Sequence, residues 1–140
     1  MSVTISSELL QRLLAEADAS PGAEVCGLLF GTAGRIDAAE ACANVAIDPA
    51  RAFEVDPKAL FAAHRQARGV GPAVIGHYHS HPSGIPVPSS RDAAQSMGDD
   101  AVWVILGGGA ARAWRSVEVG EFVEEVIDRA RMGTHQHPSS

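Results

Sequence analysis

Three histidines alternate at the end of an apolar run, at positions His77, His79 and His81. If this run forms a strand, residues two apart point to the same face, so His79 and His81 present both imidazoles to one point. A loop of Pro, Gly and Ser leads on to Asp92, and such a loop can fold this carboxylate back over the strand end. Two histidines, one carboxylate and a water form a familiar catalytic zinc shell. The spacing therefore predicts one zinc ion, bound by His79, His81 and Asp92.

A water on such a zinc ion needs partners before it can hydrolyse an amide. Its pKa falls to about 7, but a base must still pass its proton to the leaving amine. Glu24, the lone carboxylate at the mouth of a mostly apolar strand, is the candidate base, and Ser89 is the candidate donor to the developing oxyanion. Two other interpretations stay open. Glu24 could be a solvated strand-edge residue, and Ser89 could be a helix N-cap, a role that Ser90 could also fill.

The remaining histidine of the run, His77, shares the strand face of the two predicted ligands. It could be a fourth ligand or a support for the ligands, but such a residue is more often a buried, hydrogen-bonded histidine. We therefore leave His77 out of the predicted metal shell. Trp103 and Trp114 lie on apolar runs and are predicted to belong to the core rather than to a substrate platform.

Helical and extended patterns alternate along the chain and must position these groups. Leu9, Leu10 and Leu13 form an apolar helical stripe, and Asp56 followed by Pro57 is typical of a helix start. Helices are expected over about residues 8–19, 57–68 and 90–97, and strands over about 24–31, 35–46, 73–81, 102–106, 111–115 and 117–126. This order predicts an α/β fold, a three-layer α-β-α sandwich around a mixed central sheet.

Composition excludes several classes of partner. The 140 residues carry a formal net charge of -6, and Lys58 is the only lysine, so no nucleic-acid surface is expected. No apolar stretch reaches the roughly 18 residues of a membrane span and no signal pattern is present, so we expect no membrane contact and a cytoplasmic location. Cys26 and Cys42 are predicted to be free thiols. Residues 1–132 are expected to form a single domain, followed by a flexible tail at 133–140.

Together, the residues that could do chemistry resemble the JAMM (MPN-plus, Mov34/Pad-type) zinc metallopeptidase family, in its small stand-alone bacterial form. The family's pattern is an upstream glutamate, then His-x-His-Pro, a spacer and Pro-Ser-x-x-Asp. The matching pieces here are Glu24, residues 79–82 and residues 88–92, with the family's spacing between them. The resemblance covers roughly residues 5–125.

By this resemblance, the zinc ligands are His79, His81 and Asp92, while Glu24 is the general acid/base and Ser89 stabilises the intermediate. The resemblance also implies a cytidine-deaminase-like fold, the JAMM/MPN domain. The implied reaction is hydrolysis of a peptide or isopeptide bond at the C-terminus of a ubiquitin-like protein. In small stand-alone bacterial members this substrate is often a sulfur-carrier protein. The resemblance does not indicate an oligomeric state.

Three alternative functions agree less well with these residues. RadC-type proteins, linked to DNA repair, carry Asn between the two histidines and a further Asp-His segment, whereas this acidic chain has Ser80 there and lacks that segment. A non-catalytic MPN-like binding module typically lacks one or more ligands, and all are present here. A zinc nucleoside deaminase requires a Cys-x-x-Cys pair, which Cys26 and Cys42 do not form.

Overall fold

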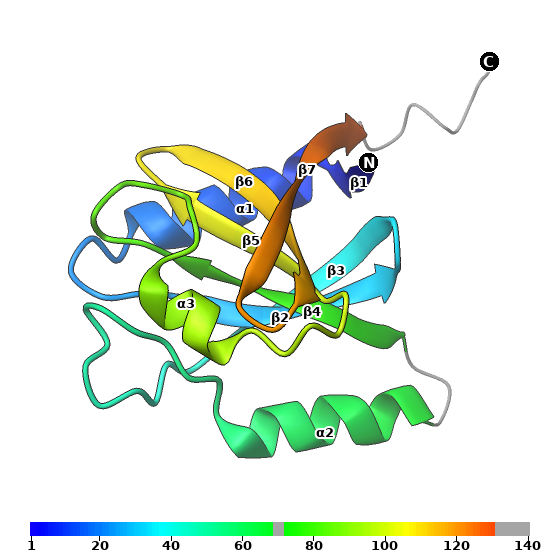
Figure 1. The fold of residues 1–140 in the computed structure, drawn as a ribbon, viewed down its shortest axis with the longest axis horizontal. Helices are drawn as coiled ribbons and strands as arrows, with labels where there is room; N and C mark the ends of the chain where they lie inside the picture. The colour runs from blue at the N-terminus through cyan, green and yellow to red at the C-terminus, as the bar shows by residue number, and fades with distance from the viewer. Residues whose placement is uncertain (69–71, 131–140) are drawn as a thin grey trace.

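Strands dominate the fold and close into a barrel. The computed structural model describes residues 1–68 and 72–130, and in these ranges the strands follow one another in the order β1-β3-β2-β4-β5-β6-β7 (Figure 1). The strands are β1 (Ser2–Ser6), β2 (Cys26–Thr32), β3 (Arg35–Cys42), β4 (Ala73–Ser80), β5 (Val102–Gly107), β6 (Ala110–Glu118) and β7 (Glu121–Ala130). The helices are α1 (Ser7–Asp18), α2 (Pro57–Arg68) and α3 (Ser90–Gln95). Within the same ranges, no helix is long and apolar enough to cross a membrane.

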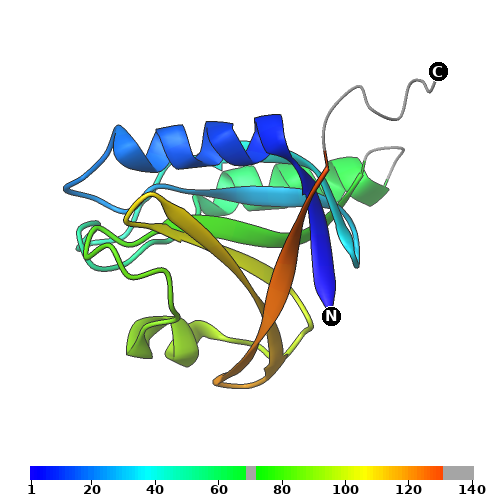
Figure 2. The same ribbon diagram turned by 90° about the horizontal axis from the view of Figure 1, so that it is seen from above.

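The predicted three-layer α-β-α sandwich is wrong. β1 was not predicted, and it pairs in parallel with both β3 and β7, so the sheet closes on itself and leaves no free edge. The three helices lie on different sides of the strands and do not form two layers around one sheet (Figures 1 and 2). The missed signal is a short alternation in which Val3 and Ile5 are buried between polar neighbours.

Most other elements agree with the prediction. α2 begins at Pro57 and ends at Arg68, as expected, and β5 and β6 differ from their expected limits by a few residues. β7 starts later than expected and extends to Ala130, which allows its second half to pair with β1. The predicted tail at 133–140 lies outside the described residues, and the domain limit at residue 132 stays a prediction.

The two faces of β4 serve different purposes. On one face Tyr78 is fully buried in the main core with Leu29 and Leu13, and its hydroxyl donates a 2.7 Å hydrogen bond to Oε1 of Glu16 on α1. The ring of His77, one residue before, instead packs against Trp103 on β5, with 4.3 Å between ring centroids. Because side chains alternate along a strand, Tyr78 anchors β4 to α1 while the histidines face the other way.

A capping box starts α3 and fixes the direction of Asp92. The Ser89 hydroxyl accepts a 3.1 Å hydrogen bond from the Asp92 amide, and the Ser89 amide donates a 2.9 Å bond to Oδ2 of Asp92. This reciprocal pair satisfies two donors at the helix start. The loop that precedes α3 is tied to the barrel, because Nε1 of Trp114 on β6 donates a 3.1 Å hydrogen bond to the carbonyl of Pro86 in this loop.

The Gly76→Ala substitution should destabilise the protein, because β4 and β5 approach closely at this residue. A Cβ at Gly76 would lie within 2.8 Å of three main-chain atoms of Val102, its parallel partner. Forcing extra volume into a packed interior costs about 1–3 kcal/mol. The matched control is Gly34→Ala, where a Cβ meets nothing within 4 Å. Urea unfolding should show a lower midpoint for Gly76→Ala than for Gly34→Ala, and equal midpoints would contradict the predicted clash.

Alanine substitutions at Ser89 and Ser90 should show which of the two serines caps α3. Ser89→Ala removes the side chain that accepts from the Asp92 amide, which should cost about 1 kcal/mol of folding free energy. Ser90→Ala leaves the cap in place and should change stability by less than about 0.5 kcal/mol. The comparison uses thermal unfolding with a chelator present, so that metal binding does not contribute. A larger loss in Ser90→Ala would show that Ser90 is the cap.

Candidate metal centre

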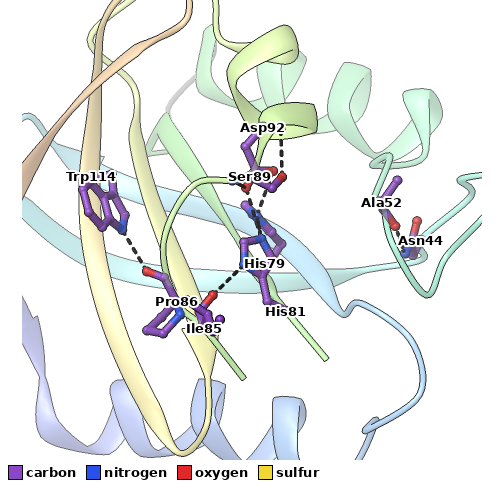
Figure 3. A network of polar contacts seen from close by, with 9 residues as sticks. All are labelled: Asn44, Ala52, His79, His81, Ile85, Pro86, Ser89, Asp92 and Trp114. Atoms are coloured by element: carbon purple, nitrogen blue, oxygen red, sulfur yellow. Dashed lines mark hydrogen bonds and ion pairs between the residues drawn. The ribbon is translucent and has the colours of Figure 1, made fainter. Parts of the chain in front are cut away.

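Two imidazoles and one carboxylate meet at the end of β4. Nε2 of His79 lies 3.2 Å from Nε2 of His81 (Figure 3). Nε2 of His79 also lies 3.2 Å from Oδ1 of Asp92, and Nε2 of His81 lies 3.1 Å from Oδ2 of Asp92. Ligands at zinc bond lengths of about 2.0–2.1 Å are separated by roughly 3.3–3.4 Å across a tetrahedron edge. The three side chains therefore have nearly the spacing of ligands around one small cation.

The ring of His81 is held in the tautomer that a metal ligand needs. Its Nδ1 lies 2.8 Å from the carbonyl oxygen of Ile85, which can only accept a hydrogen bond. Nδ1 therefore carries a proton. Burial would lower the pKa of His81, but its bond with Asp92 raises it, and the protonated ring donates from Nε2 to Oδ2 of Asp92 at 3.1 Å. Loss of this Nε2 proton leaves the lone pair that a metal ligand needs. Because His81 follows the last residue of β4, the loop that supplies Ile85 sets the orientation of its ring (Figure 3).

Burial keeps His79 neutral and Asp92 ionised. Desolvation lowers the pKa of His79, which is fully buried, and its ring stacks on Phe53 with 4.2 Å between centroids. Burial alone would raise the pKa of Asp92, but hydrogen bonds with His79 and His81 outweigh it and hold this pKa well below its usual value. A neutral imidazole and an ionised carboxylate are the protonation states in which these groups bind a metal.

Glu24 lies beside this cluster, just before β2. One of its carboxylate oxygens and the ring nitrogens of His79 and His81 lie within 4.8 Å of one another. The residue is 6% exposed, and burial raises the pKa of its carboxyl to about 7 in the metal-free site. Its Oε1 is buried and finds no hydrogen-bond partner among the described residues. A buried, unpaired carboxylate next to two imidazoles suits a water-bearing cation, so the donor set fits a metal site.

The structure brings five predicted residues to one region: His79, His81, Asp92, Glu24 and Ser89. The roles assigned to these five residues, as metal ligands, acid/base and oxyanion donor, stay predictions. The Ser89 hydroxyl is the cap acceptor of α3, which leaves its proton to be donated elsewhere.

His77 lies next to the cluster rather than in it. Its ring packs between Trp103 and Phe53, its centroid is 5.7 Å from that of His79, and burial lowers its pKa to about 3. Trp103 is 4% exposed, in agreement with the predicted core position.

Sequence reasoning missed several supporting residues. Phe53 stacks on His79, and the only hint in the sequence was an aromatic residue within a mostly polar stretch. Trp114 was predicted as core but also holds the loop at Pro86. Asn44 contacts the main chain of Glu24, and nothing in its surroundings in the sequence distinguishes it from an ordinary turn asparagine.

Comparisons with known proteins agree with this geometry. Residues 6–118 match the family described as prokaryotic homologs of the JAB domain. A desampylase of Haloferax volcanii is 36% identical over 110 residues, which cover 75% of this chain and 79% of that protein.

Solved structures share the fold. A protein from Desulfitobacterium hafniense has a TM-score of 0.78 and 22% identity, with 99% of both chains covered. A JAB1/MPN domain protein from Archaeoglobus fulgidus has a TM-score of 0.59 and 22% identity, with 91% of this chain and 99% of that chain covered. Because the family match spans most of the chain and the JAMM residues meet at one point, this chain belongs to the JAMM family, among the prokaryotic homologs of the JAB domain.

Proposed function

We propose that this chain is a zinc-dependent peptidase that hydrolyses a peptide or isopeptide bond at the C-terminus of a ubiquitin-like protein of the sulfur-carrier type. The observation that carries the proposal is the cluster in which His79, His81 and Asp92 meet at 3.1–3.2 Å beside a buried Glu24. Family membership and the similarity to a desampylase confirm the coarser prediction of a hydrolase that acts on isopeptide bonds.

His79, His81 and Asp92 would hold the zinc ion, which supplies an acidified water when it is bound. The Glu24 carboxylate would take up a proton as the amide is hydrolysed and pass it to the leaving amine. A general acid/base works best when its pKa lies near the working pH, and burial raises the pKa of Glu24 to about 7 in the metal-free site. The Ser89 hydroxyl would donate to the carbonyl oxygen as negative charge develops there.

Location and partners form part of the same proposal. A cytoplasmic location is supported by Cys26 and Cys42, which lie opposite each other on β2 and β3 and are both free thiols. Thiols so placed persist in a reducing compartment. The substrate partner would be a small folded protein with an extended C-terminus. The acidic charge of -6 argues against nucleic acid as a partner.

The Glu24→Gln variant should keep its zinc and its fold but lose turnover. Glutamine has the same shape and cannot carry the proton, so the rate should fall about 100-fold or more. Zinc content is measured by mass spectrometry of the metal, and stability by thermal unfolding. Glu54→Gln, at an exposed position on the neighbouring segment, is the matched control and should keep full activity. Equal rates for Glu24→Gln and the natural chain would remove Glu24 from the mechanism.

The substrate class can be tested with one carrier protein presented in several forms. A ubiquitin-like sulfur carrier ending in Gly-Gly is joined either to a linear C-terminal peptide or, by an isopeptide bond, to a lysine in a peptide. Intact mass should show release of the carrier at its Gly-Gly end with zinc present, loss of cleavage with a chelator, and recovery when zinc is restored. The same Gly-Gly peptides without the folded carrier should be cleaved more slowly. The proposal fails if the zinc-loaded chain cleaves none of these substrates.

A further inference from the structure

The main chain around Glu24 lies outside the ladder of hydrogen bonds that orders the barrel. β2 begins at Cys26, whose partners in the neighbouring strands are Cys42 and His79, so Glu24 precedes the first paired residue. Its position must therefore depend on other contacts. Val25 supplies one of them, because its amide donates a 2.9 Å bond to Oγ of Ser80 and its carbonyl accepts a 3.0 Å bond from the Ser80 amide.

Both main-chain groups of Glu24 itself are bonded to the segment between β3 and α2. The Glu24 amide donates a 2.7 Å hydrogen bond to the carbonyl of Pro49. The Glu24 carbonyl accepts a 2.9 Å bond from Nδ2 of Asn44. The backbone of the proposed acid/base is thus held by residues that do not belong to the barrel.

Asn44 uses its whole amide group to make this connection. Its second Nδ2 proton goes to the carbonyl of Ala52 at 3.0 Å, a contact drawn in Figure 3. Its Oδ1 accepts bonds of 3.0 Å from the amides of Ala46 and Glu54. An asparagine amide offers two protons and one carbonyl oxygen with two lone pairs, and all four are used here.

The same segment also reaches the metal ligands. Asn44 and Val55 form an isolated antiparallel bridge, and the Val45 amide donates a 2.9 Å bond to the carbonyl of Glu54, so the segment folds back on itself. Phe53, within it, is 6% exposed and stacks on the ring of His79. One asparagine therefore fixes a segment that touches Glu24 on one side and His79 on the other.

We infer that Asn44 is a positioning residue for hydrolysis, which holds the Glu24 carboxylate at its working distance from His79 and His81. The inference rests on the proposed function of Glu24 as the acid/base. Asn44 does not touch the reacting atoms, so its effect passes through the backbone of Glu24. A displacement of about 1 Å in a catalytic group can lower a rate about 100-fold, so loss of this support should be visible in turnover.

The informative variant is Asn44→Asp. Aspartate has the same shape and keeps an oxygen for the Ala46 and Glu54 amides, but it cannot donate to Glu24 or Ala52. Asn44→Ala removes all four bonds. Asp56→Ala is the matched control, because it removes a bond to the Lys58 amide at the end of the same segment and does not contact Glu24.

The variants are assayed as zinc-loaded chains of residues 1–140 on the ubiquitin-like carrier joined by an isopeptide bond to a lysine peptide. Asn44→Asp should lower kcat by roughly 10- to 100-fold, with KM and zinc content within about twofold of the natural chain, and Asp56→Ala should keep kcat. In the Glu24→Gln background, Asn44→Asp should cause no further loss, because residues that act through one group are not additive. A kcat that stays unchanged, or an equal loss in both backgrounds, would overturn the inference.

Hydrogen–deuterium exchange provides a readout that needs no turnover. The Glu24 amide is bonded to Pro49, so exchange in the peptide that contains it should speed up in Asn44→Asp and stay slow in Asp56→Ala. Unchanged exchange would show that Asn44 does not hold this backbone. The two proposals can fail separately. If Glu24→Gln keeps its activity, Glu24 is not the acid/base. If Glu24→Gln is inactive but Asn44→Asp is fully active, only the positioning role of Asn44 is removed.

Discussion

Antiparallel pairing of β2 with β4 sets Cys26 opposite His79, and two hydrogen bonds between Val25 and Ser80 extend this contact beyond the ladder. Through this pairing, a carboxylate and two imidazoles that are far apart in the sequence reach one point. Side chains alternate along a strand, so a slip of one residue would turn the histidines to the opposite face from Glu24. The register of β2 on β4 therefore decides whether the cluster forms.

The other half of the cluster depends on a short helix and the loop before it. Asp92 is held by the capping box of α3 and by two ring nitrogens, and it is 4% exposed. The loop contributes the carbonyl of Ile85, which orients His81, and it is tied to the barrel through Trp114 and Pro86. Ionised Asp92 accepts from the Ser89 amide and lies within hydrogen-bond distance of the ring nitrogens of His79 and His81, which explains how a carboxylate can remain charged in so buried a place.

The sequence was informative where the chemistry fixes both residue types and spacing. The meeting of His79, His81 and Asp92 could be predicted from the histidine alternation and the loop that follows it, and α2 could be predicted from the Asp56–Pro57 start. The role of the three residues as metal ligands stays a prediction. The closure of the barrel could not be predicted from the sequence, because β1 is five residues long and its partners are set by strand order rather than by local pattern. The role of Asn44 could not be predicted either, since it depends on which distant parts of the chain lie next to Asn44 in the folded protein. Local sequence patterns predict the spacing of candidate ligands well, but they predict the pairing of distant strands poorly.

The barrel closes through a parallel pair of its first and last strands, with Ser2 opposite Val126 and Ser6 opposite Ala130. Every residue of the metal cluster precedes β7 in the chain, so all of them leave the ribosome before the closing strand does. Pairing between such distant segments must also offset a large loop-closure entropy, which slows folding. Until β7 arrives, β1 offers an open edge to other chains. The newly made chain is thus more exposed to strand-mediated aggregation than the closed barrel, even after the residues of the cluster have left the ribosome.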